Sequence, residues 1–231
     1  MTQTDWIQAI ATCVLVFATA GLAIVAAFQD RVRGWLTQPK LDVNLKLSPP
    51  DCHKTSLKSI TKEGVVVAEA SCYYFRLLVK NTGNQRAELV EVWAAELKKR
   101  QADGSFKTVE EFLPMNLVWS HVRRVLDSIS PDMQKFCDLG HIIDPAERPK
   151  FPMEDNPKLG VASDKAILSL DLEMQPFTMS HLIPPGAYQL TLKVAAANAK
   201  PVSKRLEVIL TGDWYKDERK MLGEGITIRT L

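Results

Sequence analysis

The pattern of hydrophobic and polar positions begins with one long apolar segment, WIQAIATCVLVFATAGLAIVAAF. No charged residue occurs between Trp6 and Phe28, and only Gln8, Thr12 and Thr19 interrupt the apolar side chains, so the segment lacks the polar face of a helix in a soluble protein. A helix of this length is about 34 Å long, which is enough to cross a hydrocarbon core of roughly 30 Å. The pattern therefore predicts a transmembrane helix over 6–28.

The residues on either side of this segment predict its orientation. The tail over 1–5, MTQTD, has no Lys or Arg, unlike the positive n-region of a cleaved signal peptide. Arg31 and Arg33 follow the segment in a juxtamembrane linker over 29–39, with Lys40 directly after it. The positive-inside rule then predicts an inner-membrane protein with its N-terminus outside and its C-terminal region in the cytoplasm.

Several side chains in and near this segment are candidate membrane contacts. The predicted flanks of the anchor are Trp6, Phe28, Arg31, Arg33 and Trp35. Tryptophan rings are favoured at the two interfaces of a bilayer. Ala23 and Ala27 are four residues apart and would let two helices approach closely, although alanine also fills a monomeric span. The lipid bilayer is thus an expected partner, and self-association stays an open alternative.

Beyond residue 40 the pattern changes to short runs typical of strands. KLDVNLKL alternates from Leu41 to Leu47 in the manner of a half-buried strand. SCYYFRLLVKN and AELVEVWAAELKK flank NTGNQ, whose Asn and Gly suit positive backbone dihedrals, so we expect a hairpin. The second arm also suits a helix, but the two-sided pattern around Leu89 and Trp93 favours a strand. ADGSF predicts a second hairpin.

The C-terminal half contains three more strand-like runs, KAILSLDLEM, GAYQLTLKVAAAN and SKRLEVILTG. Many short strands separated by turn residues indicate a mainly β fold, with one β-sandwich domain over 40–231. The segment over about 113–160 is rich in proline and is expected to be an ordered long loop inserted into the sandwich. GDWYKDERKML predicts a helix capped by Asp213.

Two stretches carry a family resemblance. FRLLVKNTGNQRAELVEVWAAEL and IPPGAYQLTLKV resemble the Asn-x-Gly hairpin and the Pro-Gly-x-Tyr strand start of bacterial immunoglobulin-like modules. The resemblance covers about half of the region after the apolar segment, and it implies an immunoglobulin-like β-sandwich without catalytic residues. Such modules are commonly extracellular, whereas the charges here favour a cytoplasmic domain.

Composition narrows the function. The 231 residues carry a net charge of only +2 with both signs mixed along the chain, so we expect no nucleic-acid partner. Of the four cysteines, three lie at irregular spacings outside the apolar segment, which is a poor disulfide framework and agrees with a reducing compartment. Zinc-ligand spacing is absent, and no cofactor or metal is expected.

Two short stretches carry the residue types of a chemical site. DCHK, from Asp51 to Lys54, combines a carboxylate, a thiol and an imidazole, but adjacent residues rarely converge in catalytic sites and a polar loop is the expected structure. WSHVRR contains Trp119, His121, Arg123 and Arg124, which could bind an anion or a partner. The same residues would also fit an amphipathic turn in which Trp119 packs and the arginines are solvated.

No nucleotide-binding or hydrolase motif occurs, so we expect no enzyme. The sequence favours a single-pass, membrane-anchored binding or scaffold module that presents a β-sandwich to a cytoplasmic protein partner. One alternative is an effector of a bacterial defence system, in which ligand binding or assembly drives the membrane spans together and disrupts the bilayer. Another is an envelope protein with its sandwich outside the cytoplasm.

Overall fold

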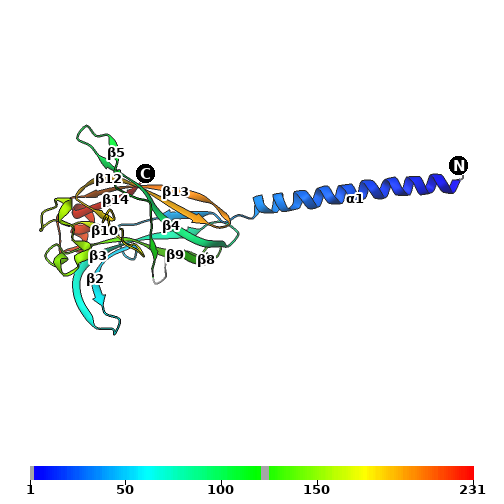
Figure 1. Ribbon diagram of the computed structural model, residues 1–231. Helices are drawn as coiled ribbons and strands as arrows, with labels where there is room; N and C mark the ends of the chain where they lie inside the picture. Colours follow the sequence, from blue (N-terminus) through cyan, green and yellow to red (C-terminus); the bar gives the residue numbers. More distant parts are fainter. Residues whose placement is uncertain (1–2, 121–124) are drawn as a thin grey trace. The chain divides into compact units, whose positions relative to one another are not determined.

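The structure is a computed structural model that describes residues 3–120 and 125–231 (Figure 1). The chain divides into two compact units, Met1–Gln38 and Pro39–Leu231. The described part of the first unit is one helix. The second unit is mainly β, and we call it the β unit.

The first unit contains α1 (Gln3–Leu36), a single helix of 34 residues. Its stretch Trp6–Gln29 is long and apolar enough to cross a membrane, which agrees with the segment expected from the pattern. Apolar side chains along this stretch, such as Phe17 and Leu22, are exposed. The stretch over 29–39, expected to be a juxtamembrane linker, is helical as far as Leu36. The first proline after the apolar stretch is Pro39, and a helix is expected to end before a proline.

Two antiparallel sheets form the β unit. In the described residues each sheet has seven strands. The strands of the first sheet are β1 (Leu41–Asn44), β2 (Cys52–Ile60), β3 (Val66–Asn81), β7 (Val118–Trp119), β9 (Gln134–Ile143), β10 (Leu168–Leu170) and β11 (Leu182–Ile183). Those of the second are β4 (Ala87–Arg100), β5 (Phe106–Thr108), β6 (Met115–Asn116), β8 (Val125–Ile129), β12 (Gly186–Ala196), β13 (Ala199–Leu210) and β14 (Ile226–Thr230).

The order of strands places the longest ones at the centre of each sheet. The first sheet runs β1-β3-β9-β10-β11, with β2 also on β3 and β7 on β9. The second runs β14-β13-β12-β4-β5, with β6 and β8 also on β4. Short helical turns are η1 (Arg148–Lys150), η2 (Pro152–Glu154), η3 (Pro157–Leu159), α2 (Glu218–Lys220) and η4 (Met221–Gly225).

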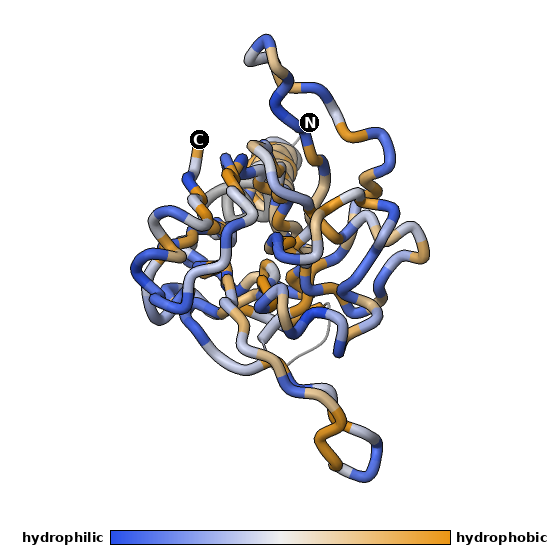
Figure 2. The backbone as a smooth tube through the Cα atoms, turned by 90° about the vertical axis from the view of Figure 1, so that its left-hand side faces the viewer, coloured by the Kyte–Doolittle hydropathy of each residue, from blue (hydrophilic) through white to orange (hydrophobic). Residues whose placement is uncertain are grey.

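Both sheets pack around one hydrophobic core. Alternate residues of β3, including Tyr73 and Phe75, are buried in the same cluster as Val90 and Val92 of β4. This is the period of two that half-buried strands require. Figure 2 shows a second apolar region at the tip of the β2–β3 hairpin, where Val65 is exposed.

Several strands occur where the sequence predicted them. The alternating run at Leu41 contains β1, with Leu41 and Val43 buried and the residues between them exposed. AELVEVWAAELKK forms a strand, and the Asp-Gly hairpin after it is confirmed because Arg100 of β4 pairs with Phe106 of β5. The first two C-terminal runs contain β10 and β12, and the third overlaps β13, which begins four residues earlier at Ala199.

The expected hairpin around NTGNQ is wrong, because β3 and β4 belong to different sheets. The connection depends on the side chain of Asn81 and not on positive dihedrals: neither Gly83 nor an Asn here is among the positive-φ residues described. The Asn81 amide nitrogen donates to the carbonyl oxygens of Gln85 and Ile129, at 2.7 and 3.0 Å. Its oxygen accepts from the backbone N–H groups of Lys40 and Gly83. Asn81 therefore joins the ends of three strands.

The expected long loop over about 113–160 is also wrong. It contains β6, β7, β8 and β9, and β9 lies between β3 and β10 inside the first sheet. Pro145, Pro149, Pro152 and Pro157 all come after β9. They therefore govern only the irregular stretch that follows, where short 3-10 helices begin with proline.

The expected helix over 212–222 is reduced to α2 and the turn η4. Asp217, and not Asp213, caps it by accepting from the N–H of Lys220 at 2.8 Å. Asp213 instead pairs with Lys165 at 2.8 Å. The residues between Asp213 and Asp217 stay outside the helix, because the Tyr73 hydroxyl donates to the backbone oxygens of Tyr215 and Lys216.

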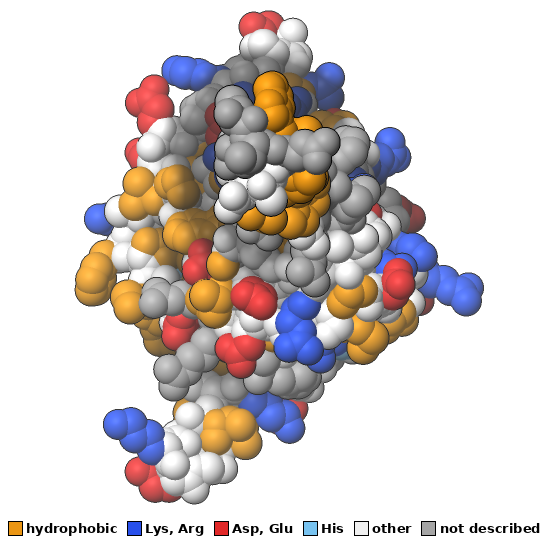
Figure 3. Space-filling view, turned by 90° about the vertical axis from the view of Figure 1, so that its right-hand side faces the viewer, with side chains coloured by type: hydrophobic (Ala, Val, Ile, Leu, Met, Phe, Trp, Pro, Cys, Tyr) orange, Lys and Arg blue, Asp and Glu red, His pale blue; other side chains and the backbone are white. Residues whose placement is uncertain are grey.

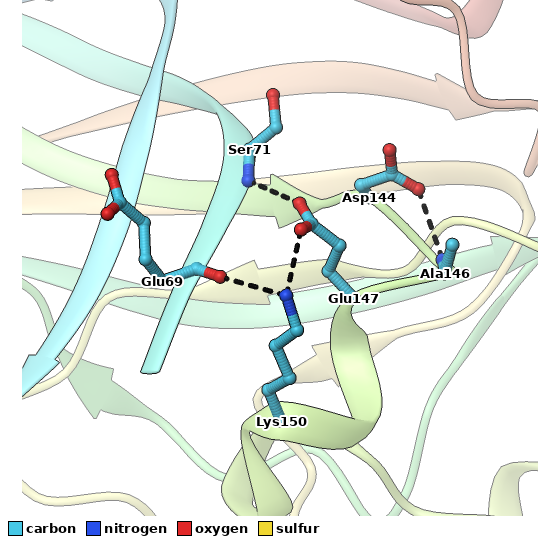
Figure 4. A network of polar contacts seen from close by, with 6 residues as sticks. All are labelled: Glu69, Ser71, Asp144, Ala146, Glu147 and Lys150. Carbon is cyan, nitrogen blue, oxygen red and sulfur yellow. Dashed lines mark hydrogen bonds and ion pairs between the residues drawn. The ribbon is translucent and has the colours of Figure 1, made fainter. Parts of the chain in front are cut away.

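Side chains close one edge of β3 beyond the point where β9 ends. The N–H of Ser71 donates to the carboxylate of Glu147 at 2.7 Å, and the Lys150 ammonium donates to the backbone oxygen of Glu69 (Figure 4). Lys150 also pairs with Glu147 at 2.9 Å. These bonds replace a strand neighbour, and they attach the irregular segment after β9 to the first sheet.

Candidate functional site

A groove opens beside the loop over 171–181, which connects β10 to β11. Its volume is about 600 Å³. Its walls are mainly apolar and come from β4, from the residues around β6 and from the loop: Trp93, Leu113, Pro114, Met115, Asn116, Leu172, Glu173, Met174 and Pro176. Apolar walls with a few polar groups are typical of binding sites.

A second hollow of about 560 Å³ shares Leu113 with the groove. It is also lined by residues of the irregular segment, such as Lys158 and Leu159, and by residues from the C-terminal part of the loop, such as Met179. Leu113 and the loop over 171–181 thus stand between two hollows. We call this combined region the loop surface.

The loop surface exposes large apolar side chains to solvent. Met174 is 83% exposed, Phe177 is fully exposed and Leu113 is 52% exposed. Exposed apolar side chains beside a concave surface mark sites of protein or membrane interaction. On another face of the molecule, seen in Figure 3, basic and acidic side chains are interspersed.

A buried polar cluster holds this loop in place. His141 of β9 is 4% exposed, and its Nδ1 lies 2.8 Å from the carboxylate of Asp171, the first residue of the loop. Its Nε2 lies 3.6 Å from the carboxylate of Glu154 in η2. Gln175, in the middle of the loop, donates to the other oxygen of Glu154 at 3.4 Å. Three separate segments therefore meet at one imidazole.

The charges of the cluster determine its protonation. Burial opposes a charge on His141, but the hydrogen bond to Asp171 and the negative charges of Asp171 and Glu154 outweigh it and raise the pKa of the imidazole to about 10. Burial works against ionisation of Glu154 as well, yet the His141 ring, 3.6 Å away, holds the pKa of that carboxyl below its usual value. The cluster is an imidazolium between two carboxylates at neutral pH.

Two further rings complete the cluster. Tyr74 of β3 stacks on His141, with ring centroids 5.9 Å apart and an angle of 7° between the planes. Burial and the charge of Asp171 raise the pKa of its hydroxyl, which stays protonated. His181 at the end of the loop is fully buried, and burial lowers its pKa, so that its ring is neutral.

The cluster of His141, Glu154 and Asp171 serves to position the loop over 171–181. His141, Glu154 and Asp171 line neither hollow of the loop surface. No group of three or more His, Cys, Asp or Glu side chains in the described residues is placed to hold a metal ion. The cluster holds Asp171 at the start of the loop and Gln175 near its middle, and it leaves the side chains of Met174 and Phe177 exposed.

The anion site expected at WSHVRR is not formed by Trp119. That side chain is 1% exposed, and its indole N–H donates to the backbone oxygen of Val90 at 3.1 Å. It packs in the core, as the alternative of an amphipathic turn required. His121, Arg123 and Arg124 lie outside the described residues.

DCHK is not a loop, because β2 begins at Cys52. Asp51 is buried and accepts from the N–H of Lys46 at 3.0 Å. Burial raises the pKa of the Cys52 thiol to about 12, so it is not a nucleophile at neutral pH.

Among the expected flanks of the apolar helix, Trp6 and Phe28 are exposed. Arg31, Arg33 and Trp35 belong to α1, but their side chains lie outside those described.

The loop surface was missed by reasoning from the sequence. Its signal is DLEMQPFTMSH, where Met174, Phe177 and Met179 occur in a proline-containing segment between two strands. The cluster was missed because His141, Glu154 and Asp171 are 13 and 17 residues apart along the chain and only the order of strands brings them together.

The comparisons with known proteins do not extend this description. No family model matches the chain, and no curated protein matches it.

Proposed function

We propose that this chain is a single-pass membrane protein whose β unit is a non-enzymatic binding module for an apolar segment of a protein partner. The stretch Trp6–Gln29 of α1 supports a membrane anchor by its length and its lack of charge. Arg31, Arg33 and Lys40 follow it, which supports a cytoplasmic β unit.

The observation that carries the binding role is the loop surface. Met174 and Phe177 are presented to solvent by a loop that Asp171 and Gln175 attach to a buried ionic cluster, beside two hollows with mainly apolar walls. Apolar residues in a fixed loop lose little conformational entropy on binding, which favours affinity. The cluster of His141, Glu154 and Asp171 lines neither hollow, which supports binding over catalysis.

The proposal also includes the type of β fold. Two antiparallel sheets around one core support an immunoglobulin-like β-sandwich. The position of β3 and β4 in different sheets is expected of strands that cross between the layers of a sandwich. Superposition of the two sheets, strand by strand, on those of immunoglobulin-like modules tests this assignment.

The binding role is tested by photocrosslinking in cells that produce the full chain. A photoreactive amino acid at Lys158, in the wall of the second hollow, is expected to give an adduct with one protein. The double variant M174S/F177S is expected to lose this adduct, because the apolar contacts of the partner are removed. The matched control is V65S/V67S, which removes two exposed apolar side chains from the tip of the β2–β3 hairpin. Equal adducts in both double variants would refute the loop surface as the binding site.

Membrane insertion and orientation are tested separately. The protein is expected to stay in membranes after carbonate extraction and to keep its residues before 28. A cysteine in place of Asp103, at the exposed tip of the β4–β5 hairpin, is expected to react with an impermeant maleimide only after the membrane is opened. Labelling in intact cells would place the β unit outside, and cleavage near residue 28 would identify a signal sequence.

A further inference from the structure

The polar side chains of the apolar stretch in α1 follow a regular spacing. Between Trp6 and Gln29 the side chains with an amide or a hydroxyl group are Gln8, Thr12, Thr19 and Gln29. Together with Leu15, Leu22 and Ala26 they form a series in which successive residues are alternately four and three positions apart. At 3.6 residues per turn this spacing keeps all seven on one side of the helix. We call this set the heptad stripe.

The hydrogen bonds of the stripe are incomplete within one helix. The Thr12 hydroxyl donates to the backbone oxygen of Gln8 at 2.8 Å, and the Thr19 hydroxyl donates to that of Leu15 at 2.7 Å. The side-chain amide of Gln8 has no partner among the described residues. Near the edge of a hydrocarbon core such an amide gains from a hydrogen-bond partner on another helix.

We propose that α1 forms a parallel homodimer through the heptad stripe. This inference rests on the proposed membrane anchor. A second copy is the occupant that the stripe fits, because copies inserted in the same direction place Gln8 opposite Gln8 at the same depth. The amide is both donor and acceptor, so the two can bond each other.

The residues between the polar positions agree with this geometry. One of the two inner heptad positions holds the β-branched residues Thr12 and Thr19 and then Ala26. The other holds Leu15 and Leu22, with a glutamine at each end of the stripe. In soluble coiled coils a β-branched residue with leucine in these positions favours two parallel strands. The pair Ala23 and Ala27 lies off the stripe, so a dimer through small residues would use a different face of the helix.

Cysteine crosslinking in isolated membranes tests the proposal with the full chain. The background is Cys13→Ala, because the other three cysteines are buried in the β unit. Single cysteines in place of Thr12, Leu15, Thr19 and Leu22 are expected to give disulfide dimers on mild oxidation. Cysteines in place of Val14, Phe17 and Ile24, which lie off the stripe, are expected to give several-fold less.

A second measurement tests the role of the amide. Gln8→Leu is expected to weaken dimer formation by roughly threefold to tenfold, as for one hydrogen bond between helices in a membrane. The double variant Q8L/I10Q restores an amide off the stripe and is expected to stay as weak as Q8L.

The outcomes separate the two proposals. Uniform crosslinking, no crosslinking, or a maximum at cysteines replacing Ala23 and Ala27 would overturn the heptad dimer in a protein that resists carbonate extraction. Loss of the protein from membranes in carbonate would overturn the anchor and the dimer together.

Discussion

His141 is the residue on which the geometry of the loop surface depends. It is buried between two carboxylates: its Nδ1 is hydrogen-bonded to Asp171 at 2.8 Å, and its Nε2 lies 3.6 Å from Glu154. The folded pKa of about 10 lies above the value of 6.5 expected in the unfolded chain. The folded protein therefore binds this proton more strongly than the unfolded protein does.

This difference predicts a pH dependence of stability. A raised folded pKa contributes stability that is fully present below pH 6.5 and is lost as the pH rises through about 10. We expect the free energy of unfolding to fall over this range in the full-length protein in detergent, measured by urea titration and tryptophan fluorescence. His141→Gln removes the ionisable group, so its stability deficit is expected to be largest at pH 6 and to shrink by pH 10. A deficit that stays constant with pH would contradict the ionic role of His141.

Asn81 gives a second prediction at the scale of one residue. Its fully buried amide bonds the backbone at four positions and joins β3 to β8 and to the residue before β1. Asn81→Ala removes these bonds and leaves buried backbone groups without partners, so we expect a loss of about 3 kcal/mol in the free energy of unfolding. Thr82→Ala is the control, because the Thr82 hydroxyl makes one exposed bond, to Lys40. Equal losses of unfolding free energy in the two variants would show that the buried amide of Asn81 contributes no more to stability than the exposed hydroxyl of Thr82.

At the scale of elements, the pairing of β9 with β10 requires a glycine. A Cβ at position 140 would lie 2.2 Å from the backbone oxygen of Ser169, which cannot move without breaking the pairing. We expect Gly140→Ala to destabilise the protein by about 3 kcal/mol, the upper end for overpacking. Chemical denaturation measures this loss. Gly223→Ala places its Cβ in open space and is expected to change the stability by less than about 0.5 kcal/mol. A small effect at Gly140 would contradict the close approach of the two strands.

Strands with a clear alternation of apolar and polar residues, and hairpins with a characteristic turn, could be predicted from the sequence. The sheet in which each strand lies could not. The alternation at Leu41 and the Asp-Gly turn before Phe106 identify β1 and the β4–β5 hairpin, because side-chain period and turn chemistry act over a few residues. The placement of β4 in the second sheet depends on Asn81, whose partners include Ile129, 48 residues away. The prolines after β9 led to a wrong prediction for this strand, because the sequence alone does not show whether such prolines follow a strand or interrupt it.

The candidate site shows the same limit. The apolar residues of the loop over 171–181 are visible in the sequence, but their exposure depends on the cluster that fixes the loop. That cluster forms because β9 lies beside β10 and brings His141 to Asp171. Trp119 was a candidate ligand contact because of its neighbours in the sequence, yet the pairing of β7 with β9 directs it into the core.

At the scale of the whole molecule, the thiols divide between the two units. Cys13 in α1 is exposed, whereas Cys52, Cys72 and Cys137 are buried in the β unit. Burial raises the pKa of Cys52 and of Cys72 to about 12, and that of Cys137 well above its usual value. Only the thiolate reacts quickly with maleimide, so both access and ionisation protect these three residues.

We therefore expect the full-length C13A variant in detergent to show no rapid modification in its native state and three adducts after unfolding in urea, counted by intact mass. Because the three buried thiols belong to β2, β3 and β9 of one sheet, they should become reactive together as the β unit unfolds. Rapid modification of any of them in the native C13A variant would show that the first sheet opens locally, and the packing described for its central strands would then be wrong.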